Sequence, residues 1–354
     1  MKDFHIKDFH IKDFHIKDFL LKKKIYCILI LLNALCLLAF SIFSFAYDGL
    51  SRQLLHEHQA GIWAGESEER YAQVSCFLPA DSSVTVEDIA AFRQKVDEKL
   101  LEVSLETEEG KSLYIDAYSA EAKLNLKNGD RLANVHALGV SENYFFFHNL
   151  FLRSGSYLTS WDLMQDRIVL DENTAWNLFG SFDVAGMELS INGKPFVVAG
   201  VVKRDQHKVS KLAEESTPSV VYLDYSVIAD QAPIRCYELI MPNPISDFAF
   251  SVVKENFPIG ERGAVLENSS RFRVPRIADL FFDYGKRLMQ TDGIIYPSWE
   301  NAARLLEARM SWLLLLAAIS AILPLCSILV VMVVLYRRLH LYIKEKIMDR
   351  RIAA

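Results

Sequence analysis

Two long apolar runs dominate the hydrophobic pattern of the chain. One covers residues 25–46 and the other residues 311–336, and neither contains a charged residue. A helix needs about 20 apolar residues to cross roughly 30 Å of hydrocarbon, so we expect two transmembrane helices. A cleaved signal peptide is the alternative for the first run, because Ser44-Phe45-Ala46 ends in small residues. The apolar core of a signal peptide spans only about 7–15 residues, which favours an uncleaved anchor.

The charges beside these runs predict their orientation. Lys22–Lys24 precede the first run, and Arg337, Arg338, Lys344 and Lys346 follow the second. Lysine and arginine near the ends of a span mark its cytoplasmic side. We therefore expect a two-pass cell-membrane protein, surrounded by membrane lipid, with cytoplasmic tails at residues 1–24 and 337–354. The long section at residues 47–310 then lies outside the cytoplasm.

The outer section begins with a strand followed by a helix. Residues 72–78 nearly alternate and stop at Pro79, as a strand does. An amphipathic helix follows, with Ile89, Phe92, Val96 and Leu100 on one face. Before this unit, His56 and His58 flank Glu57. The two histidines are two positions apart and point to different helix faces, so we expect these to be surface residues.

A second strand-and-helix unit lies late in the outer section. A strand at residues 237–241 stops at Pro242, and a helix over about 246–256 follows. Residues 271–274 alternate again and are interpreted as a returning strand. The two units together predict one α+β lobe, formed by residues of about 70–110 and 231–296.

The insertion at residues 111–230 is predicted to form a β-rich lobe. Residues 166–170 have the pattern of a strand, and a helix over 172–179 follows them. Asn192-Gly193 is a strong hairpin signal between two further strand patterns. We thus predict a membrane α+β fold, in which two transmembrane helices flank a split α+β lobe and an inserted β-rich lobe.

The last helix of the outer section is predicted to begin at Pro297-Ser298, where the residue types suit a helix start. No helix-breaking residue separates this start from the second apolar run. One continuous helix would therefore form a stiff connection between the outer section and the membrane.

Composition and motifs exclude several function classes. The net charge of −6 gives no sign of nucleic-acid binding. The sequence lacks a phosphate-binding loop, an H-E-x-x-H pair, a C-x-x-C pair and a G-x-S-x-G elbow. We therefore predict no enzyme activity, no cofactor and no metal. The tail repeats Lys-Asp-Phe-His-Ile in tandem, and recent duplication is favoured over metal binding by its histidines.

Two cysteines, Cys76 and Cys236, lie in the outer section. An oxidising compartment would permit a disulfide between them. Two free buried thiols fit the sequence equally well, because free cysteine behaves as a small hydrophobe. Both alternatives stay open at the level of the sequence.

A series of short motifs stands between Gly139 and Asp205. They are Gly139-Val140-Ser141-Glu142-Asn143-Tyr144-Phe145, Arg153-Ser154-Gly155-Ser156, Arg167-Ile168-Val169-Leu170, Asn177-Leu178-Phe179-Gly180, Val184-Ala185-Gly186-Met187 and Asn192-Gly193-Lys194-Pro195-Phe196. Their occurrence together in this order resembles the periplasmic core domain of MacB-type ABC-transporter permeases, whose relatives include FtsX and the lipoprotein-release permeases. The resemblance implies a membrane subunit of an export or signalling complex that transmits mechanical force, with a separate ATPase and a second permease-like subunit as partners.

The resemblance also implies an ATPase-coupling segment directly after the second apolar run. Its candidate residues are Arg337, Arg338, Lys344, Glu345, Arg350 and Arg351. Residues 345–354 depart from the family pattern because they lack its glycines. The family's third and fourth spans do not follow them, which fits half of a split permease, an accessory subunit or a truncated copy. The alternative is a membrane-anchored extracellular binding or sensor module without an ATPase.

Overall fold

The computed structural model describes residues 5–105, 112–159, 161–203, 210–212, 219–283 and 294–352. Side chains of residues 5–22, 282–283 and 345–352 lie outside the described part. The chain forms two compact units: a helical unit of residues 1–50 and 309–354, and a domain unit of residues 51–308. Each unit is considered by itself.

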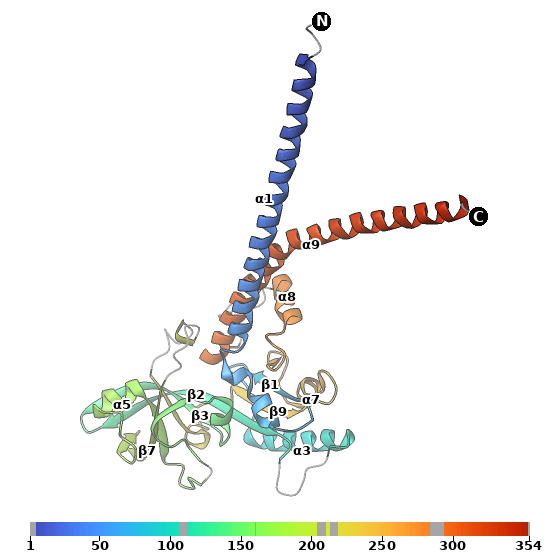
Figure 1. The fold of residues 1–354 in the computed structure, drawn as a ribbon. Helices are drawn as coiled ribbons and strands as arrows, with labels where there is room; N and C mark the ends of the chain where they lie inside the picture. Colours follow the sequence, from blue (N-terminus) through green and yellow to red (C-terminus); the bar gives the residue numbers. More distant parts are fainter. Residues whose placement is uncertain are drawn as a thin grey trace. The chain divides into compact units, whose positions relative to one another are not determined.

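Two long helices supply the helical unit. Helix α1 extends over His5–Ser51 and helix α9 over Ser298–Ile352, so α9 begins within the domain unit (Figure 1). The apolar parts lie within Lys23–Ser51 and within Ser298–Lys344. Both helices are long and apolar enough to cross a membrane. The predicted helix start at Ser298 and its continuation into the second apolar run are confirmed.

The domain unit is an α+β fold with a β-rich core. Its helical elements are η1 (Leu55–Glu57), α2 (Gln59–Ala64), α3 (Val86–Glu102), α4 (Tyr144–Phe147), α5 (Glu172–Phe179), η2 (Tyr225–Val227), α7 (Phe248–Asn256) and α8 (Val274–Asp283). Its strands are β1 (Tyr71–Phe77), β2 (Ile115–Asn128), β3 (Arg131–Val140), β4 (Phe151–Gly155), β5 (Arg167–Asp171), β6 (Glu188–Ile191), β7 (Lys194–Lys203), β8 (Val220–Asp224), β9 (Cys236–Pro242) and β10 (Ala264–Glu267).

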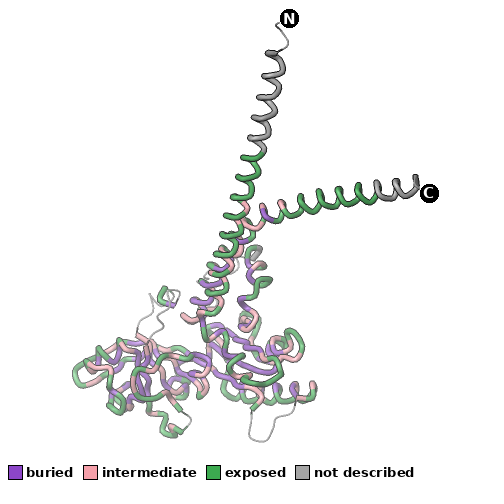
Figure 2. The backbone as a smooth tube through the Cα atoms, viewed as in Figure 1, coloured by how far each residue is buried: buried purple, intermediate pink, exposed green. Residues whose placement is uncertain are grey.

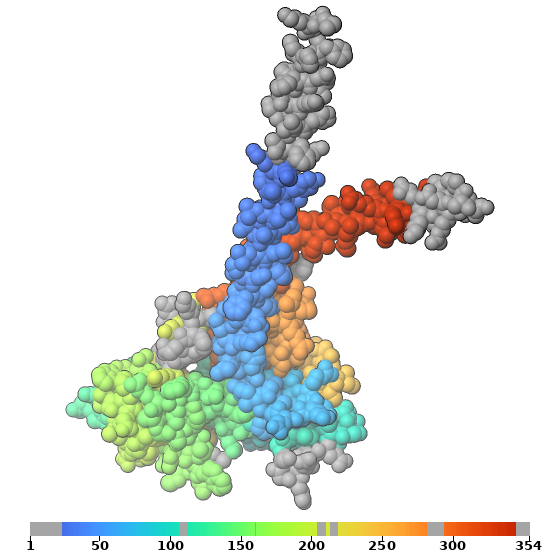
Figure 3. Space-filling view, in the orientation of Figure 1, coloured from blue at the N-terminus to red at the C-terminus, as the bar shows by residue number. Residues whose placement is uncertain are grey.

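The strands form one mixed sheet in the order β10-β1-β9-β2-β3-β8-β5-β7-β4, with β6 paired to β2 and β7. Most neighbours are antiparallel, and β3–β8 and β5–β7 are parallel. Figure 2 shows the buried residues concentrated along these strands. In the space-filling view, the green and yellow-green segments gather at one end of the domain unit and cyan α3 lies at the other (Figure 3).

Strand β2 is long enough to join both predicted lobes. Its residues 115–119 pair with β9, and its residues 119–128 pair with β3. One hydrophobic cluster likewise contains buried residues from α3, β5 and β7. The split into an α+β lobe and a β-rich lobe remains a prediction, because the sheet itself is continuous across that division.

Helix α3 shows why the early prediction succeeds. Thr85 accepts a hydrogen bond from the backbone of Asp88, whose carboxylate accepts one from the backbone of Thr85. This capping box satisfies two of the free amides at a helix start. The predicted apolar stripe is the buried face: Ile89, Phe92, Val96 and Leu100 are all buried.

Two features of the predicted β-rich region are also confirmed. Helix α5 covers residues 172–179, and Asn192-Gly193 connects β6 to β7. Both hairpin residues have positive φ, 50° and 82°, which suits a two-residue turn that matches the strand twist.

Two predictions are wrong, and both concern buried charge. Residues 271–274 do not form a strand; β10 ends at Glu267, and Arg271 lies in the turn that follows. Glu57 is buried rather than at the surface. The sequence patterns mislead because each charged side chain points inward, where ion partners replace water.

Candidate functional site

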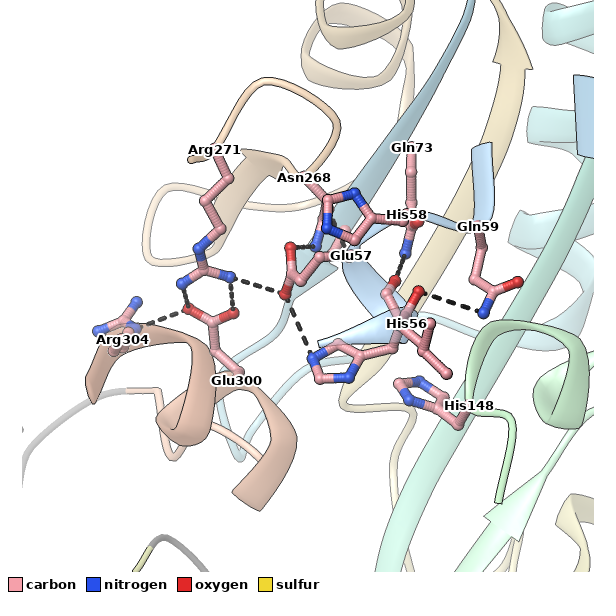
Figure 4. A network of polar contacts seen from close by, with 12 residues as sticks. His56, Glu57, His58, Gln59, Gln73, His148, Asn268, Arg271, Glu300 and Arg304 are labelled. Carbon is pink, nitrogen blue, oxygen red and sulfur yellow. Dashed lines mark hydrogen bonds and ion pairs between the residues drawn. The ribbon is translucent and has the colours of Figure 1, made fainter. Parts of the chain in front are cut away.

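The candidate site is a buried ionic cluster centred on Arg271. The guanidinium donates to both oxygens of Glu300, at 2.7 and 2.9 Å. It also donates to Glu57 Oε1 at 3.1 Å and to Glu307 Oε1 at 2.8 Å. The Arg271 side chain is 1% exposed and its three partners are at most 4% exposed. We call these four residues the Arg271 cluster; Figure 4 labels Arg271, Glu57 and Glu300.

Three separate chain segments meet in the Arg271 cluster. Glu57 ends η1, only a few residues after the last residue of α1. Glu300 and Glu307 lie in the first turns of α9, two turns apart and therefore on the same helix face. Arg271 comes from the turn after β10 and fills the space between them.

A line of polar contacts extends from the Arg271 cluster into the sheet. Asn268 donates to Glu57 Oε2 at 3.0 Å, and Ser75 Oγ lies 2.9 Å from Asn268 Oδ1. The Ser75 hydroxyl also lies 3.3 Å from Glu238 Oε1. Because a hydroxyl has one proton, it donates either to Asn268 or to Glu238 at any moment. Glu238 Oε2 lies 2.6 Å from His148 Nε2. The cluster is thereby linked to β1 and β9.

The electrostatics of the cluster favour the charged forms of Glu57 and Arg271. Burial opposes the charge of Glu57, but Arg271, His56 and Asn268 together outweigh burial and lower the pKa of Glu57 to about 2. Burial likewise opposes the charge of Arg271, yet Glu300, Glu57 and Glu307 raise the pKa of Arg271 well above its usual range. Removal of one partner from such a buried pair costs about 3–5 kcal/mol.

Aromatic side chains cover the cluster. The Trp299 ring lies 4.7 Å from the His148 ring and 5.7 Å from the His56 ring, between centroids. Arg304 donates to Glu300 Oε1 at 2.7 Å, and its guanidinium stacks 3.6 Å from the centroid of Tyr296. The ion pairs of Arg271 are themselves buried, and buried charges attract each other more strongly than charges in water.

The Arg271 cluster holds chain segments in position. Within the described residues, no group of histidine, cysteine, aspartate or glutamate side chains is arranged to hold a metal ion. The carboxylates of the Arg271 cluster are already occupied by guanidinium and amide donors. The cluster therefore fixes η1, the turn after β10 and the start of α9 against one another.

The predicted coupling residues lie at the other end of α9. Arg337, Arg338 and Lys344 are exposed on that helix. Arg337 and Lys344 are seven residues apart and therefore share a helix face. The side chains of Glu345, Arg350 and Arg351 lie outside the described part, so the coupling role of all six residues remains a prediction.

Cys76 and Cys236 are buried, free thiols on neighbouring strands. In the β1–β9 register, Cys76 stands opposite Tyr237, and Phe77 stands opposite Cys236. Because adjacent residues of a strand point to opposite faces, the two thiols lie on opposite sides of the sheet. Burial raises the pKa of both thiols. The structure corresponds to the free-thiol alternative.

Sequence reasoning missed the Arg271 cluster. Its residues come from positions 57, 271, 300 and 307, and only the pair on α9 is close in sequence. One signal was available, since Glu300, Arg304 and Glu307 recur at helical spacing just before a long apolar run. Nothing in the sequence shows that Arg271 faces them.

Comparison with known proteins gives partial matches. The macrolide export ATP-binding/permease protein MacB of Neisseria gonorrhoeae and that of Neisseria meningitidis serogroup B are each 31% identical to this chain over 91 residues. That stretch covers 25% of this chain and 14% of each relative. This chain therefore matches only a small part of these relatives.

Two solved structures also align. The extracellular domain of the noncanonic ABC-type transporter YknZ from Gram-positive bacteria is 15% identical, with a TM-score of 0.37, over 55% of this chain and 99% of that chain. The periplasmic region of MacB from Actinobacillus actinomycetemcomitans is 18% identical, with a TM-score of 0.38, over 62% of this chain and 94% of that chain.

The strongest comparison covers more than half of the chain. Residues 28–241 match the MacB-like periplasmic core domain. Glu57 and Glu238 lie inside these residues, whereas Arg271, Glu300 and Glu307 lie beyond them. The chain belongs to the family of the MacB-like periplasmic core domain.

Proposed function

We propose that this chain is a membrane subunit of an ABC-type export or signalling complex that transmits mechanical force. Membership of the MacB-like family supports the class of complex. The observation that carries the mechanism is that α9, with Pro324 inside it, is one helix from the Arg271 cluster to the basic residues Arg337 and Arg338. A displacement at those basic residues would pass along the helix to Glu300 and Glu307.

The contacts of the domain unit suit such a role. Glu300 and Glu307 are held by Arg271, and Asn268 and Ser75 continue the line to β9. A buried ionic cluster costs several kcal/mol to break, so a pull on α9 moves the sheet before it separates the helix from the sheet. Neither apolar run, residues 25–46 or 311–336, contains a charged side chain. Charged side chains within a membrane usually mark ion or substrate paths, so these runs suit a subunit that passes no polar substrate through them.

The proposal includes a topology and two partners. Both termini lie in the cytoplasm, and residues 47–310 lie outside it, because basic residues flank both spans on one side. A separate ATPase binds the segment from Arg337 to Arg351, and a second permease-like subunit completes the membrane part.

The second candidate is a membrane-anchored binding or sensor module without an ATPase. It is favoured by residues 345–354, whose sequence lacks the glycines of the family's coupling segment. Under this alternative the Arg271 cluster serves only to hold the domain at its anchor.

Co-purification from native membranes distinguishes the two candidates. We expect an ATPase to co-purify with the native chain in mild detergent and to be lost with Arg337→Glu/Arg338→Glu. The matched control is Arg337→Lys/Arg338→Lys, which keeps both charges and should retain the ATPase. Labelling of single cysteines from each side of the membrane checks that the charge reversal leaves the topology intact.

The outcomes separate clearly. Recovery of the folded native chain without any ATPase would reject the transporter subunit and leave the anchored module. Equal ATPase recovery with both variants would keep the complex but reject these two arginines as its contact.

A further inference from the structure

We propose that Arg271 fixes the axial register of α9, so that the helix cannot slide along the domain by one turn. The inference deepens the proposed function, because a helix that transmits displacement must not slip against the body it moves. It rests on the order of charges along the first turns of α9, and it concerns residues of the domain unit alone.

The guanidinium of Arg271 reaches two carboxylates on one helix. Two of its nitrogens hold Glu300, and Nε holds Glu307. These carboxylates are seven residues apart, which is about 10.5 Å along the helix axis. Figure 4 shows the contact with Glu300. Together with the bond to Glu307, it means that Arg271 holds α9 at two levels rather than at one point.

Arg304 stands between the two levels on the same side of the helix. It donates to Glu300 Oε1 at 2.7 Å, and its side chain is 24% exposed. Arg304 is four residues from Glu300 and three residues from Glu307. Both separations correspond to about one helical turn.

A slide of one turn is opposed in both directions. A shift of about 6 Å one way brings Arg304 to the position of Glu300, and a shift of about 4.5 Å the other way brings it to that of Glu307. Either shift sets one guanidinium against another inside a site that excludes water. Like charges there repel strongly because the local dielectric is low.

Rotation of α9 about its axis also breaks the ion pairs of Arg271. Successive residues turn by about 100° around the helix axis, so a small rotation removes both carboxylates from Arg271. The guanidinium, which is 1% exposed, would then keep only Glu57 as a partner. In the native register, each carboxylate of the cluster has at least one guanidinium partner.

Photo-cross-linking reports this register directly. A photoreactive phenylalanine analogue replaces Trp299, whose ring lies 4.7 Å from His148, 5.5 Å from Phe77 and 5.7 Å from His56. In the full chain in detergent micelles, we expect cross-links to the segments around these three residues. A slide of one turn would carry the label about 5 Å away from them.

Two variants, called release variants, are designed to let α9 shift along the domain. With Arg304→Glu, Arg271 faces a carboxylate both in the native register and after a slide of one turn. Arg304→Lys, which keeps the positive charge, is the matched control. In the second variant, the cluster is neutral: Arg271→Met with Glu57→Gln, Glu300→Gln and Glu307→Gln. Its control neutralises another pair, Arg93 and Asp116, which are 2.8 Å apart, through Arg93→Met/Asp116→Asn.

We expect both controls to keep the native cross-links. In each release variant, the yield of those cross-links should fall to about half if two registers become equally populated. Native cross-links in a release variant that folds would overturn the inference. Failure of both release variants to fold, with both controls folded, would also overturn it and leave Arg271 a structural role only. No ATPase is needed, so the result stands apart from the co-purification test.

Discussion

The Arg271 cluster buries charged side chains, whereas the loop between β4 and β5 exposes apolar ones. In the cluster, charged side chains are buried and paired with one another. In the loop of residues 156–166, three large apolar side chains are exposed: Trp161 at 87%, Leu163 at 89% and Met164 at 83%. We call this segment the Trp161 loop; residue 160 lies outside the described part.

Polar contacts connect the Trp161 loop to neighbouring segments of the domain unit. Asp162 pairs with Arg167 at 2.9 Å, and Gln165 accepts a hydrogen bond from Ser226 at 2.6 Å. Tyr157 stacks on Phe145 with centroids 4.8 Å apart. We expect burial, rather than residue type, to decide how much a side chain contributes to stability. The charges of the cluster should then matter greatly for the free energy of unfolding, and the apolar side chains of the loop hardly at all.

The largest effect is expected from Arg271→Met. The substitution leaves three buried carboxylates without their common counter-charge, so unfolding should become easier by about 3–5 kcal/mol. Thermal unfolding of the full chain in detergent, followed by tryptophan fluorescence, measures the change. The neutral variant of the cluster is the control and should recover most of the loss, because well-packed neutral replacements of buried ion pairs are often tolerated. An equal loss in both would mean that shape, not charge, holds the cluster together.

The second effect is a dependence on pH that comes from Glu57. Its pKa is about 2 in the folded chain, below its ordinary value of 4.5. A lowered folded pKa gives stability that is present above about pH 4.5 and lost as the pH falls toward 2, amounting to about 3 kcal/mol. Glu57→Gln should remove this part of the acid sensitivity in unfolding experiments between pH 6 and pH 2. An unchanged pH profile would show that Glu57 is not held ionised by Arg271.

Elements encoded by neighbouring residues could be predicted from the sequence, and the buried charges could not. Helix α3 and the Asn192-Gly193 hairpin are encoded locally, by a capping box and by a turn type, and both are predicted. The Arg271 cluster depends on residues more than 200 positions apart, such as Glu57 and Arg271. Their inward direction contradicts the usual assumption that charge marks a surface. The cysteine question also needs the β1–β9 register, which no local pattern supplies.

The third prediction concerns the backbone at the start of the Trp161 loop. Gly155 has a φ of +75°, and an added Cβ would lie 2.2 Å from the Ala199 carbonyl oxygen and 2.7 Å from the Gly200 Cα. Gly155→Ala should therefore destabilise the fold by about 1–3 kcal/mol. The matched control is Gly186→Ala, which has a φ of +83° but no atom within 4 Å of an added Cβ. Equal losses in the two variants would assign the cost to φ alone rather than to the close approach of β7.

The smallest effect is expected from the exposed side chains of the same loop. Trp161→Ala, Leu163→Ala and Met164→Ala remove large apolar groups that are more than four-fifths exposed, so each should change stability by no more than about 0.5 kcal/mol. Thermal unfolding again measures the change, with Phe92→Ala as the contrast, because Phe92 is 2% exposed and its loss should cost about 3–5 kcal/mol. A loss above about 1 kcal/mol from Trp161→Ala would show that the loop packs on the domain in solution, and the contrast with the Arg271 cluster would fail. If the three substitutions together leave stability unchanged but lower self-association of the purified chain, the exposed apolar surface is confirmed.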